Sequence, residues 1–226
     1  MNILSFINTP FKEKFGIPRQ PLLVKSAIGT MRFPKNDFFM EAFRGIEAYS
    51  HLWLLFQFHE VNEENIKALV RPPRFEGEKR GVFATRSPHR PNRIGMSVVK
   101  FEKLEVTHSE VILTVSGVDL LDGTPILDIK PYLPYADVVS EATAQEIERP
   151  EKVKVVWECE RPEDYELIEE CLSYDHRPTS KKEEGIEYGV LIGDYNIRYK
   201  VLKGTAYLLD ISRILSFFIL STILST

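Results

Sequence analysis

Short apolar runs bounded by Gly, Pro and Asp fill the first two-thirds of the chain, and they constrain its fold more than any other feature. The runs are rich in valine, isoleucine and aromatic residues, which favour strands. They cover residues 22–31, 50–58, 81–85, 94–106, 111–117 and 125–129. No long helical pattern separates them, which favours antiparallel pairing over a parallel, doubly wound sheet. We therefore predict a mainly β or α+β fold built on a small antiparallel β-barrel. Residues 62–70 are expected to form one short helix capped by Asn62.

The pattern changes after about residue 134, where an acidic stretch without strand periodicity is expected to form a linker. A smaller unit follows. Its expected elements are a strand at 153–158, a helix at 162–172 with Pro162 in its first turn, and a meander with turns at Gly193-Asp194 and Lys203-Gly204. We therefore divide the chain into a barrel domain, residues 1–137, and a small C-terminal α+β unit, residues 138–226.

The two ends of the chain give no sign of a membrane segment. The apolar C-terminal stretch 214–226 is thirteen residues long, whereas a helix needs about 20 to span a bilayer. We expect a terminal strand or a packed helix there, and a divergent end stays open as an alternative. The N-terminus has no basic start followed by a sustained apolar core, so no secretory signal is expected.

Charge and cysteine content narrow the class of protein. The net charge is only −4, yet residues 71–93 hold seven basic and two acidic residues. A basic face on an acidic protein suits a defined anionic ligand, although a solvated charged loop explains the count equally well. The two cysteines, Cys159 and Cys171, form no CxxC pair. They indicate neither a disulfide framework nor a zinc site, which fits a reducing cytoplasm.

Several familiar catalytic motifs are absent from the sequence. There is no GxGxxG, no GxxxxGK[ST], no GxSxG and no HExxH. The missing glycine-rich phosphate loop argues against a Rossmann-type dinucleotide-binding or methyltransferase fold.

Two segments concentrate residues with binding chemistry. Residues 81–97, GVFATRSPHRPNRIGMS, gather guanidinium groups, which hold carboxylates or phosphates through paired donors. Residues 119–134, DLLDGTPILDIKPYLP, place three aspartates around a Gly-Thr-Pro turn. Arg86 is expected after an apolar strand, where it would bind an anionic ligand or form an internal salt bridge to Asp119 or Asp122.

These segments resemble the signature of the TrmO family, also called the YaeB, TsaA-like or UPF0066 family. Further matching segments are KEKFGIPRQP at 12–21, GIEAYSHLWLLFQFH at 45–59, RPPR at 71–74 and DYNIRYKV at 194–201. The resemblance covers most of residues 10–202. It implies a β-barrel tRNA methyltransferase that uses S-adenosylmethionine and modifies threonylcarbamoyladenosine beside the anticodon. The sequence departs from the family pattern DPRPAY at His176 and Thr179, which bears on substrate contacts.

The resemblance also assigns roles to residues of this chain. The expected cofactor pocket for S-adenosylmethionine consists of Arg19, Gln20, Pro21, His59, Glu60, Arg86, Met96, Leu120, Leu121, Asp122, Gly123 and Thr124. Asn92, Asp128 and Tyr132 are expected to orient the nucleophile in catalysis, and the last two share a strand face with Lys130. Arg90, Arg93, Arg177 and Arg198 are expected to contact the tRNA anticodon loop.

The same resemblance implies a homodimer. The run at 50–58 also favours one, because it is more apolar than a half-exposed strand requires. A buried core strand explains that run as well. A non-catalytic β-barrel module that binds RNA or a nucleotide is the alternative function.

Overall fold

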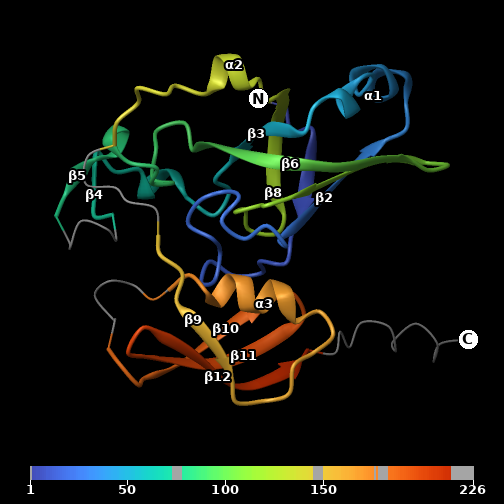
Figure 1. Cartoon of the computed structure of the whole chain (residues 1–226). Coiled ribbons are helices and arrows are strands. Elements are labelled where there is room, and N and C mark those ends of the chain that lie inside the picture. The colour runs from blue at the N-terminus through green and yellow to red at the C-terminus, as the bar shows by residue number, and fades with distance from the viewer. Residues whose placement is uncertain (1, 73–77, 145–149, 176, 178–182, 215–226) are drawn as a thin grey trace, which may run out of the picture.

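Six strands close into an antiparallel barrel in the order β1-β2-β7-β6-β3-β8 (Figure 1). The computed structural model describes residues 2–72, 78–144, 150–175, 177 and 183–214. The barrel strands are β1 (Ser5–Asn8), β2 (Ile28–Pro34), β3 (His51–Gln57), β6 (Ile94–Val106), β7 (Glu110–Ser116) and β8 (Thr124–Pro131). The expected fold class, an antiparallel barrel with a smaller α+β unit, is confirmed.

Alternation along the strands creates the barrel core. In β3 every second side chain is buried, and Leu52 and Leu54 are at most 1% exposed. Met31 of β2 and Leu113 of β7 are fully buried in the same core. Each such side chain contributes about 1.5–3 kcal/mol relative to its exposed state. The intervening side chains of β3 point outward, which leaves Trp53 and Leu55 partly exposed.

Short elements cover the barrel. They are α1 (Asp37–Ala42), α2 (Pro134–Asp137), the two-stranded pair β4 (Leu69–Val70) and β5 (Arg80–Gly81), and 3-10 turns at Ile46–Ala48, Glu63–Asn65 and Val82–Ala84. Asn36 caps α1 by accepting a hydrogen bond from the Phe39 amide. The rings of Phe39 and Phe43 then pack on Phe33, with centroids 5.1 and 4.9 Å from it.

The C-terminal unit is a four-stranded sheet with one helix packed on it. The sheet has the order β10-β11-β12-β9 and consists of β9 (Lys154–Trp157), β10 (Glu187–Ile192), β11 (Tyr195–Leu202) and β12 (Thr205–Arg213). The helix α3 (Tyr165–Leu172) buries Ile168, Cys171 and Leu172. Both expected hairpin turns are confirmed, because Gly193, Lys203 and Gly204 have the positive φ angles that tight hairpin turns require.

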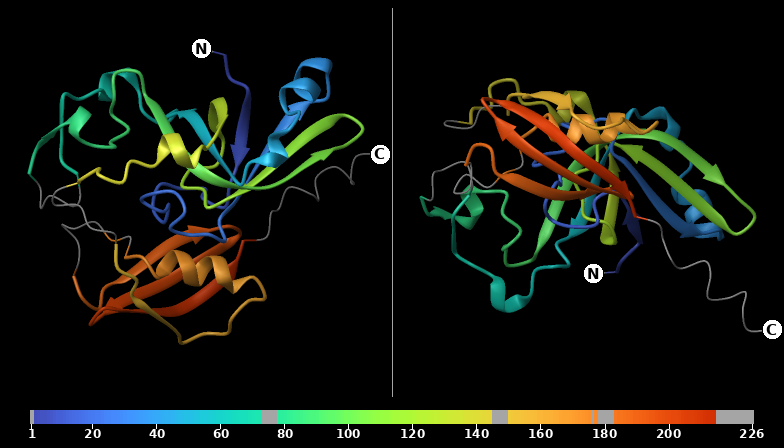
Figure 2. Two further views of the ribbon diagram at one scale, coloured as in Figure 1. Left: turned by 45° about the horizontal axis from the view of Figure 1, so that its top comes forward. Right: turned by 90° about the horizontal axis from the view of Figure 1, so that it is seen from below.

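The C-terminal unit lies against one end of the barrel (Figures 1 and 2). The chain segment 9–27 runs between the two, and α3 faces it. The amide and hydroxyl of Ser26 both donate to Glu170 Oε2 of α3, at 2.9 and 2.7 Å. The amide of Gly193 donates to Pro10 O at 2.7 Å. These contacts attach the C-terminal unit to a barrel loop rather than to a barrel strand.

Four local expectations are wrong. Residues 62–70 do not form one helix, because the 3-10 turn at Glu63–Asn65 gives way to β4. Of the strand expected at 81–85, only Gly81 pairs, in β5, and Val82–Ala84 form a 3-10 turn. The strand expected at 22–31 begins only at Ile28, since residues 21–26 form turns. The helix expected to begin at Pro162 begins at Tyr165.

The structure also adds features that the sequence did not predict. The first barrel strand, β1, and the helix α1 had no expected counterpart. β9 pairs with β12 in parallel, whereas a meander was expected. None of the helices in the described part of the chain is long and apolar enough to cross a membrane. Of the tail 214–226, residues 215–226 lie outside the described residues.

Candidate functional site

Three chain segments meet at the barrel end that faces the C-terminal unit. The register places the last residues of β1, β3 and β7 beside the first residues of β2, β6 and β8. The connecting segments at this end are therefore 9–27, 58–93 in its described parts 58–72 and 78–93, and 117–123 (Figure 1). These three segments, here called the loop cluster, contain most of the residues expected to bind the cofactor.

Arg86 connects two of these segments. Its guanidinium Nη1 donates a hydrogen bond to the side-chain oxygen of Gln20. A local turn fixes the backbone before it, because the Thr85 hydroxyl donates to Val82 O at 2.9 Å and accepts from the Ser87 amide at 3.2 Å. The Arg86 side chain is exposed and keeps further donors free for an anion. Its expected role as an anion-binding residue fits this geometry and stays a prediction.

Arg19 and Pro21 lie in the same segment as Gln20. Arg19 Nη2 donates to Arg177 O of the C-terminal unit at 3.2 Å. Arg19 and Pro21 are both half-buried. This part of the loop cluster is therefore held between the barrel and the C-terminal unit.

Asp119 brings the third segment to the cluster. Its Oδ1 accepts a 2.6 Å hydrogen bond from the hydroxyl of Ser97, which is 2% exposed and points inward from β6. Burial raises the pKa of Asp119 to about 6 from its ordinary 3.8, against the opposing effects of Ser97, its own backbone amide and the charge of Arg86. Asp119 is thus a carboxylate of the cluster whose charged form is disfavoured by burial.

The turn 120–124 is tied to the segment after β1. Both carboxylate oxygens of Asp122 are engaged, Oδ1 by the Thr9 amide at 2.8 Å and Oδ2 by Lys12 Nζ at 2.8 Å. Asp122 therefore fixes the loop in this structure, in addition to any ligand contact. Gly123 has φ 73°, and the space where a Cβ would lie is open.

The neighbours of Gly123 in this turn differ in accessibility. Leu120 is 2% exposed and belongs to the core, whereas Leu121 is partly exposed. Thr124 is buried, and its hydroxyl donates to Leu121 O at 2.6 Å. Of this turn, Leu121 and the backbone at Gly123 are the parts most open to a ligand.

Of the remaining expected cofactor residues, His59 and Glu60 begin the second segment of the cluster, and Met96 lies outside the cluster on β6. His59 Nε2 is 3.8 Å from Glu60 Oε1, and Lys14 of the first segment lies 3.7 Å from Glu60 Oε2. Met96 is 57% exposed on the outer face of β6, opposite the inward-facing Ser97. The sequence prediction placed all of them in one pocket, and the structure puts Met96 on the outer barrel wall beside Leu55.

The three residues expected to orient the nucleophile lie in β8, just after β8 and in the turn before β6. Asp128 of β8 pairs with Leu55, and its side chain is 49% exposed. Tyr132 follows β8, and its ring centroid lies 5.7 Å from that of Trp53. Asn92 lies in the exposed turn before β6. Asp128 and Met96 flank Leu55 on the outer wall, because β3 lies between β6 and β8.

The four arginines expected to contact tRNA differ in accessibility. Arg90 donates to Thr85 O at 2.7 Å and to Val82 O at 3.2 Å. Arg93 donates to Val61 O at 2.8 Å.

Arg177 is 5% exposed and pairs with Asp175 at 2.9 Å. Arg198 is 58% exposed. Arg177 is therefore mainly a structural residue here, whereas Arg198 presents its guanidinium to solvent. His176 and Thr179 lie outside the described residues.

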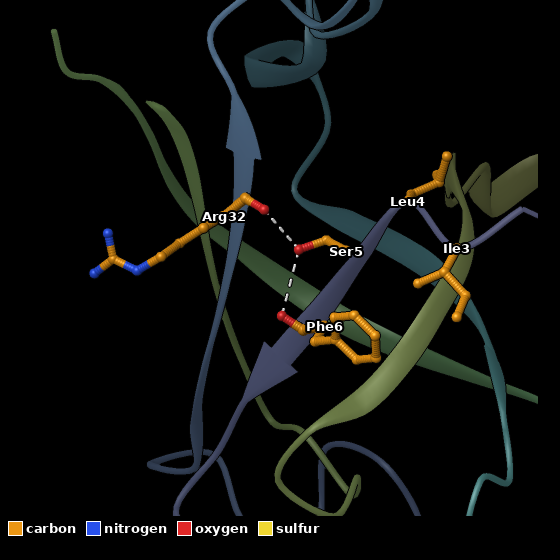
Figure 3. Close-up of a pocket in the computed structure, with 5 residues that line it drawn as sticks. All are labelled: Ile3, Leu4, Ser5, Phe6 and Arg32. Atoms are coloured by element: carbon orange, nitrogen blue, oxygen red, sulfur yellow. Dashed lines mark hydrogen bonds between the residues drawn. The ribbon is translucent and has the colours of Figure 1, made fainter. Parts of the chain in front are cut away.

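A separate hollow lies beside the N-terminal half of β1. Its lining residues are Ile3, Leu4, Ser5, Phe6 and Arg32 (Figure 3). The Ser5 hydroxyl donates to Arg32 O at 2.7 Å, so β1 and β2 close its floor. No expected site residue lines it, and we assign it no role.

Sequence reasoning missed Ser97 and gave Asp119 only the role of a salt-bridge partner. Asp119 directly follows the buried run that ends β7, and carboxylates at strand ends commonly line sites. That signal was present in the sequence, but its contact with Ser97 joins residues 22 positions apart.

The fold and the site define a β-barrel protein whose candidate ligand site is built from loops at one barrel end. The chain belongs to the tRNA-methyltransferase O family. The family model of the N-terminal domain matches residues 6–138, and that of the TrmO C-terminal domain matches residues 140–214. The resemblance inferred from the sequence is therefore confirmed.

Relatives match along most of the chain. The tRNA (adenine(37)-N6)-methyltransferase of Escherichia coli K12 is 43% identical over 216 residues, which cover 88% of this chain and 91% of the relative. The putative S-adenosylmethionine-dependent methyltransferase RcsF of Pseudomonas aeruginosa is 44% identical and covers 87% and 90%. The crystal structure of TrmO from Pseudomonas aeruginosa has a TM-score of 0.76 at 38% identity and covers 93% of this chain and 95% of that one.

Proposed function

We propose that this chain transfers a methyl group from S-adenosylmethionine to N6 of adenosine 37 in tRNA, the base next to the anticodon. Its substrate is the N6-threonylcarbamoyl form of that adenosine. Two family models and the E. coli relative, which matches over nearly its full length, support the reaction. The P. aeruginosa relative, whose name specifies S-adenosylmethionine, supports the cofactor.

The observation that carries the proposal is the loop cluster between the barrel and the C-terminal unit. Ser26 and Pro10 of the first segment hydrogen-bond to the C-terminal unit, so the loop cluster lies next to both units. A large substrate that reaches a cofactor in the cluster can therefore contact both units. The anticodon loop is single-stranded, so presenting its base to the site costs little unstacking energy.

The residues of the loop cluster fit S-adenosylmethionine. The exposed guanidinium of Arg86 would pair with the cofactor carboxylate, and the NH₂ group of Gln20 would be available to adenine because its oxygen is occupied by Arg86. The open backbone at Gly123 allows close approach of the ribose. When bound, the cofactor supplies a methyl group on a sulfonium sulfur. The protein has to align that group with N6 and accept one proton.

The direct experiment is methylation of bulk tRNA followed by nucleoside mass spectrometry. The expected product is N6-methyl-N6-threonylcarbamoyladenosine, formed only when both the chain and S-adenosylmethionine are present. Binding of tRNA with no methylated nucleoside would instead support the non-catalytic RNA-binding module.

The homodimer is a further part of the proposal. The outward side chains of β3 and β6 form an apolar strip of Trp53, Leu55, Met96 and Val98, and Met96 is 57% exposed. A strip of this kind on a closed barrel suits burial against a second copy. The paucity of cysteine and the tRNA substrate together support a cytoplasmic location.

A further inference from the structure

Asp119 occupies a particular place in the loop cluster. Ser97 holds its Oδ1 from inside the barrel at 2.6 Å. The positive charge of Arg86, in the segment between β3 and β6, lowers the pKa of the same carboxylate. The Arg86 guanidinium also donates a hydrogen bond to Gln20. Asp119 therefore lies between the barrel interior and the residues that fit the cofactor.

The surroundings of Asp119 only partly stabilise its negative charge. Burial favours the neutral acid, and the opposing groups are the Ser97 hydroxyl, the backbone amide of Asp119 and the charge of Arg86. The nearby carboxylate of Asp122 is neutralised separately, by Lys12 and the Thr9 amide. A poorly compensated carboxylate inside a ligand site is the arrangement that acid–base catalysis uses.

The methyl transfer proposed above requires such a group, so a catalytic role for Asp119 rests on that proposed function. N6 of threonylcarbamoyladenosine is bonded both to the purine ring and to a carbonyl carbon. Its electron pair is delocalised into both, so the neutral nitrogen is a weak nucleophile. Removing the N6 proton as the new bond forms restores the electron pair for attack.

We infer that Asp119 is the proton acceptor of the methyl transfer and that Ser97 positions its carboxylate. The N6–H bond breaks and the proton moves to Asp119, while the released electron pair forms the N6–CH₃ bond. The CH₃–S bond breaks and its electrons remain on sulfur, which changes from sulfonium to neutral thioether. Asp119 then releases the proton to water, so charge and atoms balance with no further reactant.

Asp128 is the competing acceptor, because the sequence pattern placed it beside the nucleophile. Its side chain is 49% exposed on the outer wall, its Oδ1 accepts from the Ile129 amide, and Lys130 lies 3.9 Å away. It therefore belongs to a different face of the barrel from the loop cluster. The variants Asp119→Asn and Asp128→Asn make a matched pair, because each removes one carboxylate and keeps the shape of the side chain.

The first test is a single-turnover methylation assay with saturating S-adenosylmethionine and threonylcarbamoyl-tRNA. Asp119→Asn is expected to slow methyl transfer by about 10²- to 10⁴-fold, the usual range for a lost general base. Its affinities for the cofactor and for tRNA, measured by isothermal titration, are expected to change less than about threefold, far below the fold-loss of a charge-assisted bond. Asp37→Asn removes an exposed carboxylate of α1; it is the control and is expected to react at nearly the wild-type rate. A fast Asp119→Asn variant would overturn the inference, and a slow Asp128→Asn variant beside it would make Asp128 the proton acceptor instead.

The second test uses pH and does not depend on turnover alone. The wild-type rate is expected to rise tenfold per pH unit on its acidic limb and then level off, with a midpoint at or below about 6, since the sulfonium charge favours the carboxylate. Ser97→Ala removes a hydrogen bond that lowers the pKa of Asp119, so the limb is expected to move to higher pH. Carboxyl-carbon NMR of the cofactor-free chain should show the same shift for Asp119.

These outcomes separate the inference from the proposed function. If the wild type forms no methylated nucleoside, the proposed function fails. If the wild type is active but Ser97→Ala leaves both the acidic limb and the NMR titration unchanged, only the assignment of Asp119 fails.

Discussion

The guanidinium of Arg86 donates a hydrogen bond to the side-chain oxygen of Gln20, which lies 66 residues earlier in the chain. This bond joins the segment 81–97, which carries part of the family signature, to the matching segment 12–21. It gives Gln20 a fixed orientation and leaves the remaining Arg86 donors facing solvent. The pair is therefore already ordered within the candidate site, without any bound ligand.

Replacing Arg86 with alanine is expected to weaken S-adenosylmethionine binding about 10-fold or more, the effect of losing one charge-assisted hydrogen bond. Isothermal titration measures it directly. Arg198→Ala is the control, because its guanidinium lies in the C-terminal sheet between Glu187 and Asp210. Equal affinities for Arg86→Ala and the wild type would remove Arg86 from the cofactor site.

Arg198→Ala is expected to weaken tRNA binding and to spare protein stability. Its ion pairs to Glu187 and Asp210 span 3.8 and 3.6 Å at an exposed site, where such pairs contribute little. Loss of one phosphate contact should lower the log–log salt slope of tRNA binding by roughly 0.7. Titrations at several salt concentrations measure the slope, and an unchanged slope would exclude Arg198 from the interface.

Alanine at Arg90 and Arg93 is expected to weaken tRNA binding and also to loosen the loop. Both side chains donate to loop carbonyls, at Thr85 and Val61, and each lost bond costs about 0.5–1.5 kcal/mol. The double variant should therefore melt at a lower temperature than the wild type. A melting curve unchanged by the double substitution would contradict this structural role.

Asp119→Asn is expected to stabilise the fold, and more so at high pH. The folded pKa of about 6 lies above the ordinary 3.8, so the contribution of Asp119 to stability is complete below 3.8 and is lost as pH rises through 6. The difference in unfolding free energy between the variant and the wild type should thus grow by roughly 1–2 kcal/mol between pH 5 and pH 8. Urea unfolding at both pH values measures it, and a constant difference would contradict the raised pKa.

Glu170 is expected to attach the C-terminal unit in a pH-dependent way. Burial alone would raise its pKa, but the hydrogen bonds from Ser26 and the Lys25 amide, together with the charge of Lys152, outweigh burial and hold the pKa below the ordinary 4.5. Because the folded pKa is depressed, this stabilisation is present above 4.5 and is lost as pH falls through the folded value. Glu170→Gln should lower the unfolding free energy at pH 7 more than at pH 4, as urea titrations would show.

A dimer is expected to scatter light with twice the 26.1 kDa mass of one chain. Leu55→Asp should produce monomers, because it places a charge in the apolar strip of β3 and β6. Val106→Asp, at the far end of β6, is the control and should remain dimeric. A wild type of single-chain mass at micromolar concentration would refute the dimer.

The sequence alone determined the strands whose patterns are local. The alternation in 94–106 and 111–117, and the turn residues Gly193 and Lys203-Gly204, act within a few residues. Local patterns also misled where non-local contacts prevail. The apolar residues of 81–85 suggested a strand, but the chain turns there at Val82–Ala84 and only Arg80–Gly81 pair as a strand.

The tertiary structure decided which chemistry-bearing residues meet. The sequence marked Arg86, Gln20 and the turn after Asp119 as separate motifs, and barrel closure brought their segments to one end. The pairing of Asp119 with Ser97 and the burial that raises its pKa depend on contacts between segments distant in the chain. Desolvation is a property of the folded environment, so no local pattern encodes it. The sequence thus specified which groups are available, and the fold decided which of them are close enough to act together.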